Sequence, residues 1–222
     1  MVTVAVLPIK TFARAKHRLA EAVDVPDRRA LAEAMVGDVL AALFAVRGLD
    51  RVIVVTGEPR AAAAARAAGA DVLHDGEEAG QSAAAVLGVE SALAAGAERA
   101  LLVPGDCPAL DPEEVDGLLS RQGRAGVVIV PDRHGSGTNA LLLSPPSVIV
   151  PSFGPGSFAR HAARAHAAET VVRVAELRSL GLDVDTPEDL HALRGALIAR
   201  PGAAPRTRAL LERMLPAAAA AG

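Results

Sequence analysis

Three aspartates have the chemistry and the sequence setting for a metal site. Asp106 follows the apolar run "ALLVPG" at residues 100–105, and Asp183 and Asp185 lie in "LDVDTP" at residues 182–187. Mg²⁺ prefers oxygen ligands and keeps some of its waters, so a carboxylate at the end of a strand can bind it. The alternative for Asp106 is a cap on the turn that follows. One of the two later aspartates could reach across and complete a metal cage with Asp106.

A basic segment near the start of the chain has the charge to bind a polyphosphate. The stretch "LPIKTFARAKHRL" at residues 7–19 has no acidic residue, and the next acid is Glu21. Arginine binds phosphate through its planar fork and lysine as a point charge. A solvated basic loop is the alternative interpretation. The chain contains no P-loop motif. The basic or potentially basic residues of the segment are Lys10, Arg14, Lys16, His17 and Arg18.

Two glycine-containing loops could hold a small anion. In "DRHGSGTNALL" the glycines are followed by an apolar strand, so no helix dipole stands behind them to hold a pyrophosphate. Instead the glycines permit close backbone approach to a small ligand, and Thr138 offers a hydroxyl. In "FGPGSFARH" the loop with Gly154 opens a helix at Ser157, where exposed N–H groups can bind one small anion.

The second loop also matches a dinucleotide fingerprint over residues 154–159, with Glu176 about 20 residues beyond. This match leaves a nicotinamide-dependent oxidoreductase open as an alternative. Pro155 argues against it, because it lacks an N–H where the loop should donate. Too little chain also remains for a complete dinucleotide fold.

Several other conspicuous residues have structural interpretations. Asp111 precedes Pro112 and is expected to cap a helix. Cys107 has no nearby base to ionise it, so we expect a small packed residue. We expect His161 and His166 at surface positions of a helix, because no third metal ligand has plausible spacing. His134 is not expected to be catalytic.

Alternating elements must position these residues. Continuous apolar strands that alternate with helices predict an α/β three-layer sandwich with a mainly parallel sheet, and ligands of such sheets bind at the carboxyl ends of strands. We expect one domain over residues 1–200 and a helical or frayed tail over 201–222. The expected strands are 2–9, 51–56, 70–75, 98–104, 125–131, 140–144 and 169–174. The expected helices are 25–46, 59–68, 80–95, 112–121, 157–168 and 187–199.

The composition excludes several classes of protein. A net charge of -3 argues against a general nucleic-acid binder. No stretch suits a membrane span or a signal peptide, and a single cysteine excludes a disulfide framework, so we expect a cytoplasmic protein. Aromatic residues are only 2% of the chain, so a nucleobase would meet backbone groups and aliphatic walls.

Five stretches in a fixed order resemble the CofC/FbiD guanylyltransferases, which make an early intermediate of the deazaflavin coenzyme F-420. The match spans about residues 2–195, and its last three motifs are specific. The wider nucleotidyltransferase superfamily, of glycosyltransferase-A-like fold, opens with a glycine-rich turn that Pro8-Ile9-Lys10 replaces here. The five stretches are "PIKTFARAKHRL", "GDCPAL", "DRHGSGTNALL", "FGPGSFARH" and "LDVDTPEDL".

The resemblance implies transfer of GMP from GTP to a small phosphorylated three-carbon acid. The composition favours phosphoenolpyruvate, with 2-phospho-L-lactate and 3-phosphoglycerate as alternatives. Carried over by motif, the acceptor would contact Thr138, Gly154 and Ser157. The Mg²⁺ ligands would be Asp106, Asp183 and Asp185.

Physical reasoning adds roles for further residues. The acceptor phosphate is already ionised, so catalysis rests on positioning and charge neutralisation rather than on a general base, and two metals are plausible. Lys10, Lys16 and Arg18 would neutralise the negative charge of the triphosphate. Lys16 and Arg18 are therefore predicted to be catalytic together with Asp106. The loop Gly80-Gln81-Ser82 is the candidate for the guanine or ribose, and a plain helix start is its alternative.

Two further functions stay open at this stage. One is nucleotidyl transfer to molybdopterin or a sugar phosphate, and the other is a nucleotide-binding regulator without catalysis. The sequence does not determine the oligomeric state, so a homodimer is also open.

Overall fold

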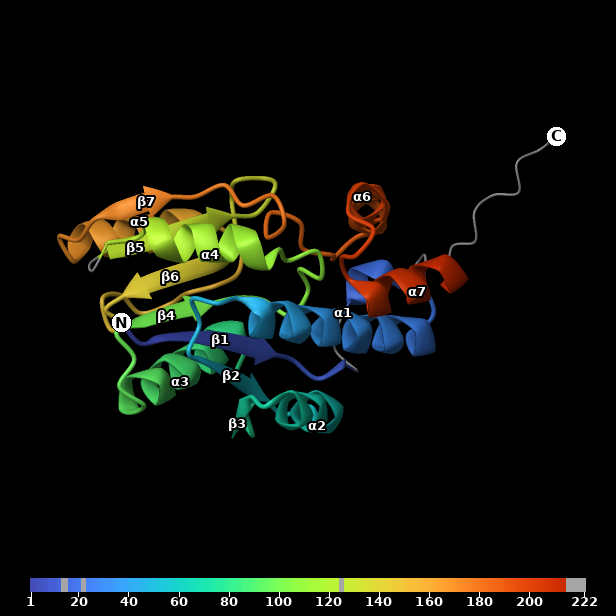
Figure 1. Cartoon of the computed structure of the whole chain (residues 1–222), viewed down its shortest axis with the longest axis horizontal. Coiled ribbons are helices and arrows are strands. Elements are labelled where there is room, and N and C mark those ends of the chain that lie inside the picture. The colour runs from blue at the N-terminus through green and yellow to red at the C-terminus, as the bar shows by residue number, and fades with distance from the viewer. Residues whose placement is uncertain (13–15, 21–22, 124–125, 215–222) are drawn as a thin grey trace.

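A seven-stranded sheet forms the centre of the molecule (Figure 1). The computed structural model describes residues 1–12, 16–20, 23–123 and 126–214. The strand order is β3-β2-β1-β4-β6-β5-β7, and only β6 runs antiparallel to its neighbours among the pairings of the described residues. The strands are β1 (Thr3–Ile9), β2 (Arg51–Thr56), β3 (Asp71–His74), β4 (Arg99–Leu102), β5 (Gly126–Pro131), β6 (Thr138–Ser144) and β7 (Val172–Val174).

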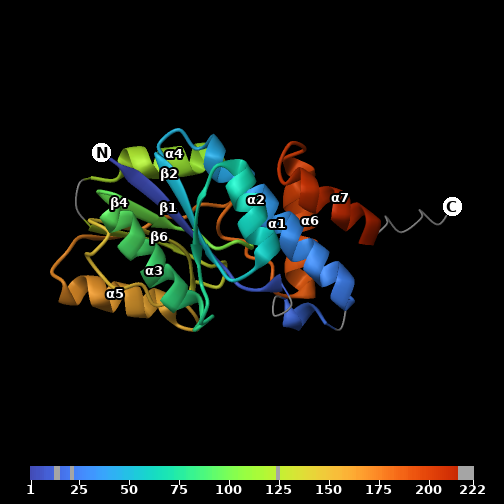
Figure 2. The same ribbon diagram turned by 90° about the horizontal axis from the view of Figure 1, so that it is seen from below.

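Helices cover both faces of this sheet, because its central strands are apolar on both sides. Side chains of α1 (Val25–Ala45), α2 (Pro59–Ala68) and α4 (Pro112–Arg121) pack with one face of the sheet in a single buried cluster. Those of α3 (Gln81–Ala94) and α5 (Ser157–Ala167) pack with the other face (Figure 2). The predicted three-layer sandwich with a mainly parallel sheet is confirmed.

Two further helices lie beyond the sheet, against the N-terminal half of α1 (Figure 2). They are α6 (Pro187–Ala199) and α7 (Pro205–Met214). Leu210 and Leu211 of α7 are buried, and the backbone N–H of Thr207 donates to the buried Asp38 carboxylate of α1 at 2.8 Å. The division into residues 1–200 and a tail stays a prediction, while the described part of that tail forms a packed helix.

The helix starts fall into two groups. Asp24, Glu58 and Asp111 accept backbone N–H bonds ahead of α1, α2 and α4, which confirms the predicted cap at Asp111. By contrast, α3 and α5 have no side-chain cap and begin after Gly80 and Gly156, whose φ angles are 111° and 69°. Glycine tolerates this left-handed backbone without a Cβ penalty.

A β-bulge re-aims the start of β6. Val130 pairs with Ala140, but the next pair along is Pro131 with Thr138, so β6 has one residue more than β5 at this point. Strict alternation would put Thr138 on the face of Ala140, which packs with α1 and α4. Instead the Thr138 hydroxyl bonds to His161 of α5, on the opposite face. Bulges redirect side chains in this way, often beside functional sites.

No helix in the described part of the chain has the length and apolar character needed to span a bilayer.

Candidate functional site

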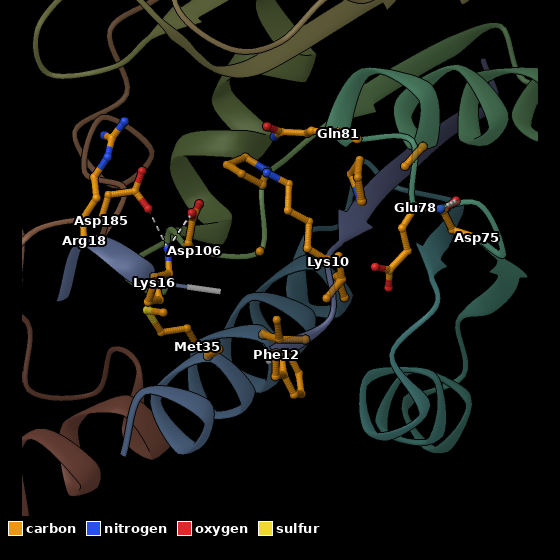
Figure 3. Close-up of a pocket in the computed structure, with 18 residues that line it drawn as sticks. Lys10, Phe12, Lys16, Arg18, Met35, Asp75, Glu78, Gln81, Asp106 and Asp185 are labelled. Atoms are coloured by element: carbon orange, nitrogen blue, oxygen red, sulfur yellow. Dashed lines mark hydrogen bonds and ion pairs between the residues drawn. The ribbon is translucent and has the colours of Figure 1, made fainter. Parts of the chain in front are cut away.

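A cavity of about 540 Å³ opens where β1 and β4 end (Figure 3). The carboxyl ends of parallel strands are the usual ligand-binding edge of such a sheet. The lining of the cavity combines positively and negatively charged side chains with aliphatic ones. The polar and glycine residues are Lys10, Lys16, Arg18, Asp75, Glu78, Gly80, Gln81, Gly105, Asp106 and Asp185.

Lys16 joins two of the predicted metal ligands. Its Nζ lies 2.7 Å from Asp106 Oδ2 and 3.1 Å from Asp185 Oδ1, and its side chain is only 6% exposed (Figure 3). Burial by itself lowers the pKa of Lys16, but the charges of Asp106 and Asp185 outweigh it, so the pKa is raised above the ordinary 10.5. The lysine is therefore a cation that two carboxylates share.

Backbone and side-chain contacts hold Asp185 in this position. The N–H of Val184 donates to the Asp106 carbonyl at 3.1 Å, which ties the two acidic segments together. Asp189 Oδ2 accepts from the N–H groups of Asp185 and Thr186, in a capping box that starts α6. Arg133 of the β5–β6 loop then pairs with Asp189 Oδ1 at 2.6 Å.

Asp183 has a different partner. Asn139 donates from Nδ2 to Asp183 Oδ1 at 3.2 Å and to the Leu180 carbonyl at 2.8 Å. Burial, followed by the neighbouring charge of Asp106, raises the pKa of Asp183 above its ordinary value. Asp183 thus lies close enough to Asp106 for that charge to raise its pKa. Lys16 forms its ion pairs with Asp106 and Asp185.

The donor set fits Mg²⁺. This ion typically takes one or two carboxylates together with waters and substrate phosphates, rather than a cage made only of protein. Asp106 and Asp185 already converge on one cation. No cluster of three or more His, Cys, Asp or Glu side chains suited to a metal ion occurs among the described residues. The predicted set with Asp183 as a third ligand stays a prediction.

The residues predicted to bind the nucleotide divide between two places. Lys10, Arg18, Gly80 and Gln81 line the cavity with Lys16. Ser82 does not line it; its Oγ accepts from the Phe153 N–H at 2.9 Å and donates to the Phe153 carbonyl at 3.4 Å. Ser82 thereby links the start of α3 to the loop before α5. Arg14 lies outside the described residues.

Sequence reasoning did not identify two acids at the far end of the cavity. Asp75 is 8% exposed and Glu78 is half-buried, and both lie across the cavity from Lys16 and Asp106 (Figure 3). The N–H of Glu78 donates to Asp75 Oδ1 at 3.1 Å. Asp75 comes directly after β3, so its place at the carboxyl edge was the signal that could have revealed it.

The residues predicted to hold the acceptor are absent from the cavity lining, but the segments that carry them contact one another. Thr138 at the start of β6 is linked through His161 to α5, which begins at Ser157. The N–H of Phe158 donates to the Ser136 carbonyl at 3.2 Å, which joins the two glycine loops. Gly154, with a φ of 102°, lies in the second of these loops, just before α5.

Arg160 organises the loop before α5. Its guanidinium donates to the carbonyls of residues 152, 153, 154 and 155 and to the Ser152 hydroxyl. Four consecutive carbonyls therefore face this one side chain. Ser157, the first residue of α5, is 1% exposed.

The glycines of the first loop serve a carboxylate of this chain. Asp132 accepts from the N–H groups of His134, Ser136 and Gly137 at 2.9–3.1 Å. A Cβ on Gly137 would lie 2.5 Å from Asp132 Oδ2, so any other residue there would displace the Asp132 carboxylate from these bonds. Because those N–H groups are bonded to Asp132, they are not available to a ligand. The polar side chain at the end of this loop that contacts α5 is Thr138.

Two expectations about single residues have opposite outcomes. Cys107 is fully buried, and burial raises the pKa of its thiol well above the ordinary value, which confirms a packed residue. The surface position expected for His161 is wrong. His161 is completely buried against Phe153, whereas His166 on the same helix is exposed. The prediction rested on the lack of a third metal ligand, which says nothing about burial, and the packing of α5 encloses His161.

Comparison with protein families and curated proteins gives consistent matches. The model of the family "Guanylyl transferase CofC like" matches residues 3–198. A phosphoenolpyruvate guanylyltransferase of Conexibacter woesei is 50% identical over 217 residues, covering 97% of each chain. Another, of Sphaerobacter thermophilus, is 39% identical and covers 88% of this chain and 94% of its own.

Solved structures share the fold at low sequence identity. A Desulfovibrio desulfuricans protein assigned as a nucleotide-diphospho-sugar transferase superposes with a TM-score of 0.77 at 18% identity, covering 96% of this chain and 95% of its own. A nucleotidyl transferase of Methanothermobacter thermautotroptrophicus gives 0.64 at 20% identity, covering 89% and 98%. At such identities the likeness concerns the fold alone, and it agrees with the expected glycosyltransferase-A-like nucleotidyltransferase architecture.

Proposed function

Because the chain belongs to the CofC-like guanylyltransferases, we propose that it transfers GMP from GTP to phosphoenolpyruvate. A phosphate oxygen of phosphoenolpyruvate attacks the α-phosphorus of GTP. The bond from that phosphorus to the β-phosphate oxygen breaks, and the electron pair leaves with pyrophosphate. The products are enolpyruvyl-diphospho-guanosine and pyrophosphate, in the formation of coenzyme F-420 that the resemblance implies.

The observation that carries this proposal is the convergence of Asp106 and Asp185 on one cation inside the cavity. A phosphoryl-type transfer requires neutralisation of the charge on the α-phosphate and on the leaving pyrophosphate. Mg²⁺ held by Asp106 and Asp185, with Asp183 as a further candidate, would supply this neutralisation. Lys16 would then pair with phosphate oxygens in place of its carboxylate partners, beside Lys10 and Arg18.

The acceptor needs no general base. The second pKa of a phosphate ester is about 6, so the attacking oxygen is already ionised at neutral pH. The chain's contribution is to place that oxygen in line with the α-phosphorus. The segments that carry Thr138, Gly154 and Ser157 contact one another through His161 and Phe158, and we assign these three residues to the carboxylate and phosphate of the acceptor.

The nucleotide lies along the cavity in this proposal. Its triphosphate takes the end with Lys16 and Arg18, and its nucleoside extends toward Gly80 and Gln81 at the start of α3. Ser82 supports that helix start through Phe153 rather than from the cavity lining. The family assignment also replaces the oxidoreductase alternative based on residues 154–159.

The test is direct. The purified protein is mixed with GTP, Mg²⁺ and phosphoenolpyruvate, and pyrophosphate release is followed while the guanylylated product is identified by mass. Parallel reactions contain 2-phospho-L-lactate or 3-phosphoglycerate, which distinguishes the acceptor. GTP binding without pyrophosphate release, from folded protein and with every acceptor, would refute the proposal and favour a nucleotide-binding regulator.

A further inference from the structure

A buried histidine lies directly behind Thr138. His161 of α5 is 0% exposed, and its ring packs edge-on against Phe153 with the centroids 5.3 Å apart. Both ring nitrogens have partners: Nε2 lies 2.8 Å from the backbone nitrogen of Ser152, and Nδ1 lies 3.0 Å from Thr138 Oγ1. The ring therefore has one fixed orientation between the loop before α5 and the start of β6.

These two contacts determine where the proton of the ring resides. The backbone N–H of Ser152 can only donate, so Nε2 must accept and carries no hydrogen. A neutral imidazole then has its hydrogen on Nδ1, which donates to Thr138 Oγ1. A protonated ring would direct a second N–H at the N–H of Ser152. In agreement, burial, with smaller effects of Arg164 and Arg160, lowers the pKa of His161 to about 4.

The tautomer in turn determines what Thr138 can do. Because Thr138 Oγ1 accepts from His161, its own hydrogen points away from the ring. Thr138 is 8% exposed, and its side chain makes no other hydrogen bond to the residues that the structure describes. A hydroxyl oriented in this way presents a donor, which is what an anionic carboxylate or phosphate requires.

We propose that His161 is a positioning residue that fixes the Thr138 hydroxyl as a hydrogen-bond donor toward the anionic acceptor. The inference rests on the proposed function, since it assigns Thr138 to the acceptor. The bulge at the start of β6 supports it, because without the bulge Thr138 would face the opposite side of the sheet from His161. His161 itself does not touch the reacting atoms.

Two substitutions separate the two nitrogens of the ring. In His161→Asn the side-chain amide nitrogen can take the place of Nδ1 and keep the donor to Thr138. In His161→Gln the amide reaches the place of Nε2, where its oxygen can accept from Ser152, but the donor to Thr138 is lost. His166→Asn, at an exposed position of the same helix, is the matched control.

Steady-state kinetics with each substrate varied in turn provide the first readout. We expect His161→Gln to raise the KM for phosphoenolpyruvate about tenfold, as for a weakened hydrogen bond to a charged group, and to leave the KM for GTP within about twofold. His161→Asn should stay near wild type. In a Thr138→Val background His161→Gln should have little further effect. Equal effects of the Asn and Gln variants, or additivity with Thr138→Val, would overturn the proposal.

The second readout uses the wild-type protein, so it depends neither on enzymatic activity nor on the folding of a variant. Nitrogen-15 NMR of the imidazole rings of the wild-type protein at pH 7 should show His161 with a protonated Nδ1 and an unprotonated Nε2. A proton on Nε2 would overturn the inference whatever the enzyme does. If this tautomer is found but no phosphorylated acid serves as acceptor, the assignment of an acceptor to Thr138 is overturned together with the proposed function.

Discussion

Asp189 offers the sharpest test of the contacts that fix the position of Asp185. Its Oδ2 accepts from the N–H groups of Asp185 and Thr186 and from the Thr186 hydroxyl, while its Oδ1 pairs with Arg133. In Asp189→Asn the amide oxygen can keep the first three bonds, and the NH₂ group then faces the Arg133 guanidinium. Only the pair with Arg133 is lost.

The expected cost follows from these contacts. A hydrogen bond to a charged group contributes about 1.5–3 kcal/mol, and the partial exposure of Arg133 reduces this to about 1–2 kcal/mol. For a chain of this size the melting temperature should fall by about 5 °C. Asp189→Ala also removes the capping box and should lose about 3–4 kcal/mol. Thermal and urea unfolding measure both values.

Activity should separate the two variants. Asp189→Asn keeps the bond to the Asp185 backbone and should retain most of the turnover, whereas Asp189→Ala releases Asp185 and should lose it. Arg133→Gln should destabilise the protein as much as Asp189→Asn, and the double variant should lose no more than either alone. Full additivity of the two changes would refute the assigned pair, and so would an unchanged melting temperature of Asp189→Asn.

The pH dependence of this pair has a defined sign. Burial by itself raises the pKa of Asp189, but hydrogen bonds from the Asp185 and Thr186 backbone, followed by Thr186 Oγ1 and Arg133, outweigh it and hold the pKa below the ordinary 3.8. The stability advantage of wild type over Asp189→Asn should therefore be present above that value and be lost as the pH falls through the folded-state pKa.

Three further changes should have effects of known direction. Asp106→Asn should reduce pyrophosphate release at least about a hundredfold, because charge stabilisation in the transition state is lost; near-normal turnover would remove Asp106 from the metal site. Gly137→Ala should destabilise the protein by about 1–3 kcal/mol in urea unfolding, since its Cβ meets Asp132 Oδ2 at 2.5 Å, and more than Gly202→Ala, which has open space around it and no positive φ. Finally, His161 has a depressed pKa of about 4, so the unfolded chain takes up its proton first as the pH falls below about 6.5. From pH 7 to pH 5 wild type should lose about 2 kcal/mol more stability than His161→Asn, and parallel curves would contradict this.

Much of the fold followed from local features of the sequence. Apolar strands alternating with helices identified the layers, because burial on both faces requires such runs. Asp111 and Thr186 marked helix starts, because a side-chain cap acts within three residues. The position of Asp106 at the end of β4 was also readable, since a strand end puts a side chain at the edge of the sheet. Features of this kind depend on neighbours along the chain.

Other features depended on segments far apart in the sequence. Lys16 meets Asp106 and Asp185 across 90 and 169 residues, and only the assembled sheet brings these three side chains to one point. His161 looked like a surface residue, yet the packing of α5 buries it completely. The bulge at the start of β6 then turned Thr138 toward it. The sequence by itself specified which elements form and which edge carries polar groups; pairing register and helix packing decided which of those groups meet, because they arise from contacts that no local pattern encodes.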